Sequence, residues 1–294
     1  MIIGNLKGGL GNQLFIYSFL YTLAKKNSTQ FFLDLTNYNL NLGKSLEIDK
    51  LELEIKECRK DSLKKFRKIS IFKLQEIIKQ KLNLRILNDN VIYEDKFSIN
   101  EFNKQYKKSN IYYLDGYWQN NNFFNANSEY FKRIFKVKNI FLSKNYERLK
   151  QEVVLTPNAL CLHVRKNDYL NKINNNIYSN ITLDYYKKAI SLIEKKKIIT
   201  KIYVFTDDIL WVKKNLHLNN IVLINDYNLT TVEEFEIMKI FKNIIISNST
   251  FSLWAALLNQ NNDNLIIVPE NWFIKNNKIF TEKLITKKMV VLRN

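Results

Sequence analysis

The stretch "LCLHVRKNDYL", Leu160–Leu170, places a His, an Arg, a Lys and an Asp directly behind an apolar run. A short apolar run of this kind is typical of a strand that is buried on both faces of a parallel sheet. The polar residues then emerge at the carboxyl end of the strand, the edge at which open α/β sheets bind their ligands. The chain has only two histidines, and one of them, His163, stands at this point.

The rest of the C-terminal half repeats this rhythm. Apolar runs alternate with helical patterns such as residues 182–197, for which Thr182 is the expected N-cap. The further predicted strands are "KIYVFTDD" (201–208), "NIVLIND" (220–226), "NIIISNS" (243–249) and "NLIIVPENW" (264–272). Apolar strands that alternate with helices indicate an α/β domain whose parallel sheet is covered on both faces.

The N-terminal half begins with a strand, a glycine loop and a helix over residues 1–27, and "QFFLDLT" (30–36) follows as a second strand. Residues 63–83 have the pattern of an amphipathic helix with a basic face. The stretch "IYYLDGYWQNNNFF" (111–124) indicates a strand that ends in an aromatic, polar loop. We place the boundary near residue 155, which predicts domains at 1–155 and 156–294.

Composition bounds the class of protein. The 294 residues are 46% hydrophobic and 13% aromatic, which argues against global disorder. The first residues lack the pattern of a signal peptide, and no window of about 18 residues is apolar and uncharged, so no transmembrane span is expected. Two cysteines, Cys58 and Cys161, cannot form a disulfide framework, which fits a reducing cytoplasm.

The net charge of +18 has several readings. It can reflect a Lys-rich composition on a solvated surface, or attraction to nucleic acid, to an anionic membrane or to a phosphate-bearing substrate. The 16 Tyr and 46 Lys plus Arg would permit nucleic-acid binding. The sequence carries no helix-turn-helix, zinc or RNP-type signature, and charge alone does not choose among these classes.

Polar clusters follow four predicted strands. The first, "KGGLGNQ" (7–13), holds half of the six glycines. Glycines between a strand and a helix allow close backbone approach to an anion, although a plain tight turn explains them equally well. The loop matches neither the Walker pattern nor G-x-G-x-x-G.

The second cluster contains Arg165, whose planar guanidinium suits a phosphate. Asp168 could pair with Arg165 in a structural salt bridge or hold its loop. His163 lies between apolar neighbours, so a satisfied core histidine is an alternative to a functional one, and no third partner suggests a nucleophilic triad.

The third cluster, Asp207 and Asp208, could bind a metal or the hydroxyls and N–H edge of a nucleoside. The fourth, Ser247–Thr250, could face an anion or simply cap a helix through Ser249 or Thr250. Together, the four strand ends describe a cleft for a nucleotide diphosphate.

Five blocks together resemble the bacterial α-1,2-fucosyltransferases of glycosyltransferase family 11. They are "GGLGNQLFIYSFLYTLA" (8–24), "GYWQNNNFF" (116–124), "HVRKNDYL" (163–170), "FTDD" (205–208) and "SNSTFSLWAALL" (247–258). The resemblance implies a GT-B-like α/β fold of two facing Rossmann-type domains with parallel sheets. It also implies GDP-L-fucose as donor, no metal or other cofactor, and inverting transfer to the 2-hydroxyl of a terminal galactose in a glycan.

The resemblance also implies roles for particular residues. Arg165 is expected to contact the β-phosphate, and Asp168 to order the same loop. The donor-binding residues are expected to be Gly9, Gly11, Asn12, Gln13, His163, Asp207, Asp208, Ser247, Asn248, Ser249, Thr250 and Phe251. The acceptor side of the site is expected at Asp115, Tyr117, Trp118 and Gln119. Lys166 and Asn167 depart from the family pattern, which often has Arg and Gly there, and Lys166 cannot form a bidentate fork.

A role in lipopolysaccharide or O-antigen assembly follows as an expectation, with no nucleic-acid partner. The basic surface suits a cytoplasmic protein placed peripherally on the inner face of the plasma membrane, near lipid-linked acceptors. The alternatives are a basic nucleic-acid-binding protein and a transferase that uses another sugar nucleotide. Asp168, Asp115 and Glu270 are the candidates for a general base.

Overall fold

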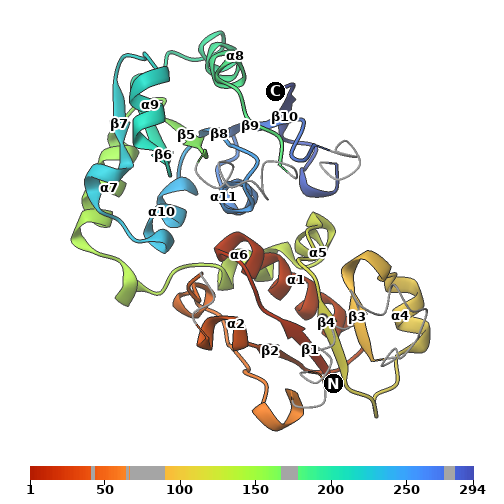
Figure 1. The fold of residues 1–294 in the computed structure, drawn as a ribbon. Coiled ribbons are helices and arrows are strands. Elements are labelled where there is room, and N and C mark those ends of the chain that lie inside the picture. The colour runs from red at the N-terminus through yellow and green to blue at the C-terminus, as the bar shows by residue number, and fades with distance from the viewer. Residues whose placement is uncertain (41–43, 64–65, 67–89, 167–177, 275–281) are drawn as a thin grey trace. The chain divides into compact units, whose positions relative to one another are not determined.

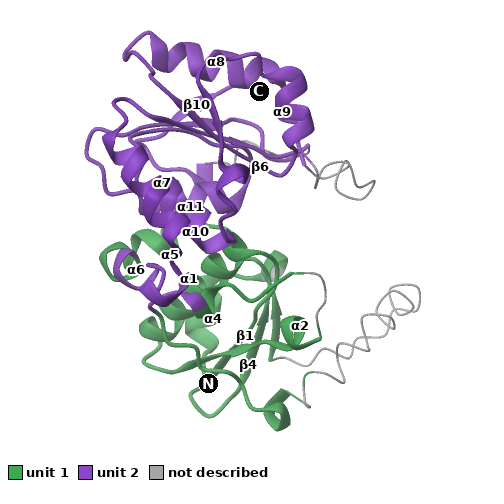
Figure 2. Cartoon of the chain, turned by 90° about the vertical axis from the view of Figure 1, so that its left-hand side faces the viewer, with its two compact units in different colours: residues 1–49, 53–131 green, residues 50–52, 132–294 purple. Residues whose placement is uncertain are grey.

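The computed structural model describes residues 1–294 except 41–43, 64–65, 67–89, 167–177 and 275–281, and most of the predicted helix at 63–83 lies outside the described residues. The chain forms two compact units, one of residues 1–49 and 53–131 and one of residues 50–52 and 132–294 (Figure 2). This division falls before the predicted boundary near residue 155. Helix α7 (Lys144–Leu155) belongs to the second unit because its buried face, Tyr146, Leu149 and Val153, packs there against α10.

The second unit is built on a six-stranded sheet in the order β10-β9-β8-β5-β6-β7, and all its strand pairs are parallel (Figure 1). Its strands are β5 (Leu160–Val164), β6 (Ile202–Thr206), β7 (Ile221–Leu223), β8 (Asn243–Ile245), β9 (Leu265–Pro269) and β10 (Val290–Leu292). This is the order of two β-α-β halves that meet between β5 and β8. The predicted parallel sheet is confirmed, and all five residues of β5 are buried.

Helices complete the second unit. They are α7, α8 (Leu183–Glu194), α9 (Ile209–Asn215), α10 (Thr231–Met238) and α11 (Thr250–Leu258), with 3-10 turns at Asn139–Phe141 and Ile224–Tyr227. The predicted N-cap of α8 is confirmed, because the Thr182 hydroxyl accepts a hydrogen bond from the Tyr185 N–H at 3.3 Å. The apolar face of α8 then packs into the core with the residues of β5 and β6.

The first unit has a four-stranded sheet in the order β2-β1-β4-β3, again parallel throughout. Its strands are β1 (Ile2–Asn5), β2 (Phe31–Asp34), β3 (Val91–Tyr93) and β4 (Tyr112–Asp115). Its helices are α1 (Leu10–Lys26), α2 (Thr36–Asn39), α4 (Ile99–Gln105) and α5 (Asn121–Asn125), with 3-10 turns at Ile48–Lys50 and Glu94–Lys96, and α6 (Ser128–Ile134) follows across the division. The strand order reverses between β1 and β4, so this unit has its own ligand-binding edge.

Close packing joins β1 to α1. A Cβ atom added to Gly4 would lie 2.1 Å from Leu20 Cδ1, and Leu20 is fully buried. Any larger residue at this position would force Leu20 to shift. Among the described residues, no helix combines the length and the apolar character that crossing a membrane would need.

We expect Gly4→Ala to reduce the free energy of unfolding by about 1–3 kcal/mol, because the added methyl group overpacks the contact with Leu20. Gly9→Ala is the matched control, since no atom lies within 4 Å of a Cβ at that position. Denaturant unfolding of the wild type and both variants measures the effect. Equal stability of Gly4→Ala and Gly9→Ala would contradict the packing argument.

Candidate functional site

The sheet of the second unit changes direction between β5 and β8. From this point the chain continues toward β6 on one side and toward β9 on the other, and open α/β sheets bind their ligands outside the carboxyl ends at such a switch point. His163 and Arg165 stand at the end of β5, and residues 246–249 connect β8 to α11. The structure therefore brings together two of the four predicted clusters at this switch point, and the third lies one strand further along, after β6.

His163 links the two sides of the switch point. Its Nδ1 lies 2.8 Å from the Ser252 hydroxyl on α11, and that hydroxyl donates to the Ser249 carbonyl oxygen at 3.3 Å. This arrangement favours Nδ1–H as the donor to Ser252 and leaves Nε2 as an acceptor. Burial, with the positive charge of Arg165 adding to it, lowers the pKa of His163 to about 3. The imidazole is therefore neutral near pH 7 and a weak base.

Tyr186 of α8 lies beneath the loops that follow β5 and β8. Its hydroxyl is fully buried next to the Ser247 hydroxyl and the backbone of Arg165, and burial raises its pKa. Within the described part of the chain it forms no hydrogen bond of full geometry. Tyr186 was not singled out from the sequence, where it belongs to the helical pattern of residues 182–197. The signal that could have marked it is its hydroxyl, which needs a polar neighbour when it is buried.

The loop after β8 contains a side chain that holds neighbouring segments in place, and it leads into a helix whose N-cap residue makes no side-chain hydrogen bond. The Asn248 amide donates to the carbonyl oxygens of Ser179 at 2.8 Å and Trp272 at 3.1 Å, so this side chain holds two neighbouring segments in place. Ser249 occupies the N-cap position of α11, yet its side chain makes no capping hydrogen bond. The start of α11 thus presents backbone N–H groups and the positive end of the helix dipole at the switch point, a favourable place for an anion.

The start of α11 carries two further predicted residues. Thr250 and Phe251 begin the helix, and the Phe251 ring centroid lies 6.2 Å from that of His163. The imidazole and the phenyl ring therefore lie next to each other, at the end of β5 and the start of α11.

The carboxylates after β6 support local structure. Asp208 is the N-cap of α9 and accepts from the Trp211 N–H at 2.8 Å, and Asp207 accepts from the Lys166 N–H at 2.7 Å. The Lys166 ammonium donates to Asn180 Oδ1 at 3.1 Å and to the Ile181 carbonyl oxygen, and it lies 4.4 Å from the Trp211 ring centroid. Lys166 therefore braces this edge of the sheet. Asp168 and Asn167 lie outside the described residues.

Glu234 is a titratable residue that the sequence analysis did not single out. It lies in the first turn of α10, which follows β7 and packs against α11. Burial raises the pKa of its carboxyl group to about 7. The adjacent Glu233 is bound by Ser143 and Thr230, so the two neighbouring glutamates have different environments.

In the first unit, the glycine loop is held by Gln13. The Gln13 amide donates to the carbonyl oxygens of Gly8 at 3.0 Å and Ser45 at 2.9 Å, and it accepts from the N–H groups of Glu47 and Ile48. This side chain is fully buried, so it fixes the loop from within. Gly8 has φ +80°, which explains a glycine there.

Further along the loop, the predicted residues differ in their surroundings. Gly9 has open space where a Cβ would stand, so a ligand could approach its backbone closely. Gly11 is buried in the first turn of α1. Asn12 Oδ1 accepts from Gln119 Nε2 at 2.8 Å, which ties the glycine loop to the turn after β4.

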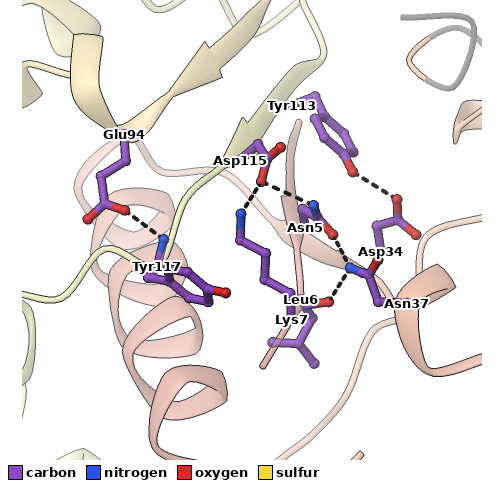
Figure 3. A network of polar contacts seen from close by, with 9 residues as sticks. All are labelled: Asn5, Leu6, Lys7, Asp34, Asn37, Glu94, Tyr113, Asp115 and Tyr117. Atoms are coloured by element: carbon purple, nitrogen blue, oxygen red, sulfur yellow. Dashed lines mark hydrogen bonds and ion pairs between the residues drawn. The ribbon is translucent and has the colours of Figure 1, made fainter. Parts of the chain in front are cut away.

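A polar network surrounds that turn (Figure 3). Asp115 Oδ1 accepts from Lys7 Nζ at 2.6 Å and from Asn5 Nδ2 at 3.1 Å, and Glu94 Oε2 accepts from the Tyr117 N–H at 2.7 Å. Asn37 donates to Asn5 Oδ1 at 2.8 Å and so joins helix α2 to the network. Glu94 was missed because it stands in no recognisable motif. Lys7 begins the quoted stretch KGGLGNQ, but its partner Asp115 is distant in the sequence. The predicted acceptor-side residues Asp115, Tyr117, Trp118 and Gln119 do lie together in one turn.

No group of three or more His, Cys, Asp or Glu side chains suited to a metal ion occurs among the described residues.

Comparison with known proteins identifies relatives over nearly the whole chain. The sequence model described as Glycosyl transferase family 11 matches residues 1–288. The O-antigen biosynthesis glycosyltransferase WbnK of Escherichia coli is 27% identical, with 93% of this chain and 95% of that protein covered. An alpha-1,2-colitosyltransferase of Escherichia coli is 28% identical, with 93% and 92% covered.

Solved structures share the fold. The fucosyltransferase NodZ from Bradyrhizobium has a TM-score of 0.54 at 12% identity, covering 87% of this chain and 92% of that one. NodZ α-1,6-fucosyltransferase soaked with GDP-fucose has a TM-score of 0.52 at 12% identity, covering 87% and 91%. A mutant of Arabidopsis thaliana FUT1 in complex with GDP has a TM-score of 0.50 at 12% identity, covering 91% and 69%. With two parallel α/β units, these similarities confirm the predicted GT-B-like fold class.

The buried, neutral His163 predicts a particular pH dependence of stability. Its folded pKa of about 3 lies below the ordinary value of 6.5, so the unfolded state binds more protons between these values. Stability from this group is therefore present above about pH 6.5 and is lost as the pH falls, by up to about 1.4 kcal/mol per pH unit.

His163→Asn keeps a nitrogen donor for Ser252 but does not titrate. We expect the difference in free energy of unfolding between wild type and variant to shrink as the pH is lowered from about 7 to 4. Denaturant unfolding at several pH values measures this difference. A difference that stays constant with pH would show that His163 is not held neutral.

Proposed function

The chain belongs to glycosyltransferase family 11 and is a glycosyltransferase, and from that premise we propose that it transfers L-fucose from GDP-L-fucose to the 2-hydroxyl of a terminal galactose. The observation that carries the proposal is the position of Arg165. It follows β5 at the switch point of the second unit, across from the start of α11. A guanidinium and the positive end of a helix at one site both attract the negatively charged phosphates of a nucleotide diphosphate.

The identity of the nucleotide rests on the relatives. NodZ has been studied with GDP-fucose and with GDP, and the FUT1 mutant with GDP. We assign the guanine to the side of the crevice that His163 and Phe251 border, and the diphosphate to Arg165 and the residues Ser249 and Thr250. Asp207 or Asp208 would read the N–H edge of the base, as the resemblance to the family implies.

The proposed chemistry follows from charge. As the glycosidic bond breaks, the β-phosphate gains negative charge and the fucose gains oxocarbenium character. A guanidinium fixed at the β-phosphate interacts more strongly with the transition state than with the ground state, and this difference lowers the barrier. The acceptor hydroxyl attacks from the opposite face, so the configuration inverts. His163 is too weak a base for the proton of that hydroxyl, because its pKa is about 3.

The colitosyltransferase relative favours a second candidate donor. At 28% identity over 93% of this chain it is as similar as the O-antigen glycosyltransferase, so colitose is an alternative to fucose as the transferred sugar. Thermal-shift titration with GDP-fucose, GDP-colitose and UDP- and CDP-sugars separates these donors. Stabilisation by a UDP- or CDP-sugar, with none by a guanosine diphosphate sugar, would reject both candidates.

The biological setting stays a proposal as well. The similarity to an O-antigen biosynthesis glycosyltransferase supports a galactose-terminated O-antigen or lipopolysaccharide acceptor. A position in the cytoplasm, peripheral to the inner face of the plasma membrane, would bring the basic chain to lipid-linked acceptors. The reaction is proposed to be independent of metal, so EDTA should leave transfer unchanged.

Arg165→Ala is expected to reduce kcat for transfer by roughly 10²–10³-fold or more, since it removes a charge that acts on the leaving group. Arg165→Lys should recover little, because an ammonium cannot form the two parallel hydrogen bonds of a guanidinium. Transfer from GDP-fucose to lactose and N-acetyllactosamine, followed by mass spectrometry, measures the effect.

Arg293→Ala is the matched control, because it removes the same charge from an exposed position near the end of the chain. Thermal unfolding of all variants should be close to that of the wild type. Near-normal transfer by Arg165→Ala would remove the central residue of the proposal. A wild-type protein that is folded but transfers fucose to no galactoside would reject the proposed activity itself.

A further inference from the structure

We propose that the loop between α6 and α7 is a membrane-contact tip, which inserts Ile140 and Phe141 into an anionic phospholipid surface. The tip comprises residues 138–142 and belongs to the second unit. The inference rests on the peripheral membrane position proposed above and names the surface that makes the contact. It does not depend on which sugar is transferred.

Two consecutive apolar side chains face solvent at the tip. Ile140 is 84% exposed, and no other large hydrophobic side chain among the described residues is more exposed, while Phe141 is 38% exposed. Both belong to the 3-10 turn Asn139–Phe141, in which no residue is buried. Single exposed apolar residues are common on soluble proteins, but two adjacent ones on a turn place contiguous apolar area in water. A partner that covers this area gains the hydrophobic free energy of its burial.

Two buried carboxylates of α10 hold the tip at its two ends. Glu236 Oε1 accepts from the Val137 N–H at 2.9 Å, and Glu233 Oε1 accepts from the Ser143 N–H at 2.6 Å. Glu233 and Glu236 are both buried, and a buried carboxylate is costly unless hydrogen bonds compensate for its lost hydration. Helix α10 thus uses two such groups to fix the backbone on either side of the exposed pair.

The base of the tip is rigid as well. Leu51 pairs with Val137 in an antiparallel bridge, and backbone hydrogen bonds of 2.8 Å and 2.9 Å flank this bridge. The Phe141 N–H donates to the Lys138 carbonyl oxygen at 3.0 Å and closes the turn. A tip that is already ordered loses little conformational freedom on binding, which favours insertion into a partner.

Basic residues surround the apolar pair. Lys136 and Lys144 are exposed on either side of it. Residues 132–148 contain six Lys or Arg and one Glu, and six positive charges less one negative charge give a net charge of +5. Apolar side chains that enter the acyl boundary, beside cationic side chains that stay at the headgroups, bind peripheral proteins to anionic membranes. The tip combines both features.

The local charge favours a lipid surface over a second copy of the chain. A symmetric contact between two tips would bring together two segments of net charge +5, which repel each other. An anionic bilayer has the opposite charge at its surface and an apolar interior beneath it. It therefore complements the basic residues and the exposed pair together.

Ile140→Ser combined with Phe141→Ser tests the tip. Co-sedimentation of the full chain with vesicles of phosphatidylglycerol and phosphatidylethanolamine in equal parts measures binding. We expect the wild type to bind and the double variant to bind at least about tenfold more weakly, because the removed side chains supply the inserted apolar area. The wild type should bind vesicles of phosphatidylcholine alone much more weakly, since the attraction between charges is absent there.

Val154→Ser combined with Leu155→Ser is the matched control. It also removes two consecutive exposed apolar side chains, 70% and 81% exposed at the end of α7, but residues 150–158 contain one Lys and one Glu and so no net charge. Ile198→Ser controls for charge, because Ile198 is 82% exposed and follows three lysines but stands at another loop. Both controls should bind the anionic vesicles as the wild type does.

The outcomes separate the tip from the proposed position and from the proposed activity. If the wild type binds the anionic vesicles and the Ile140→Ser, Phe141→Ser variant binds equally well, the tip is wrong and the membrane position stands. If the wild type binds no vesicles, both are wrong, and transfer to lactose in solution still tests the activity. An equal loss of binding in the control variants would also overturn the tip. So would a wild-type dimer in sedimentation velocity that the double variant loses, since it would assign the exposed pair to a second copy.

Discussion

The reversal of strand order between β5 and β8 is the constraint on which the second unit depends. It places the ends of two buried strands side by side and sends the chain away from them in opposite directions. The His163–Ser252 hydrogen bond then ties β5 to α11, so Arg165 and the start of the helix are set by the same contact. Because the imidazole is buried and neutral, it joins these elements without adding a charge that would compete with Arg165.

The strand order reverses in both units, and different polar groups stand at the two reversals. At the switch point of the second unit, a guanidinium and helix N–H groups suit an anion. At that of the first unit, the Lys7 ammonium pairs with Asp115, and Glu94 accepts from the Tyr117 N–H.

Much of the fold could be predicted because parallel strands buried on both faces have a strong apolar signature. The strands, the cap at Thr182 and the clusters after β5 and β8 were all visible in the sequence. What the sequence could not show depends on contacts between distant segments. The glycine-loop motif predicts a ligand-binding role for Gln13, whereas in the structure its amide forms hydrogen bonds with Ser45, Glu47 and Ile48. The left-handed backbone of Trp118, whose indole stacks on Phe19, has no local sequence signal.

The central claim is that a guanosine diphosphate binds at the carboxyl ends of β5 and β8, and amide hydrogen exchange with and without GDP tests it most directly. We expect slower exchange at residues 163–166 and 247–253 when GDP is bound, because these amides lie at the carboxyl end of β5 and around the start of α11. Binding of GDP with unchanged exchange in both segments would contradict the account.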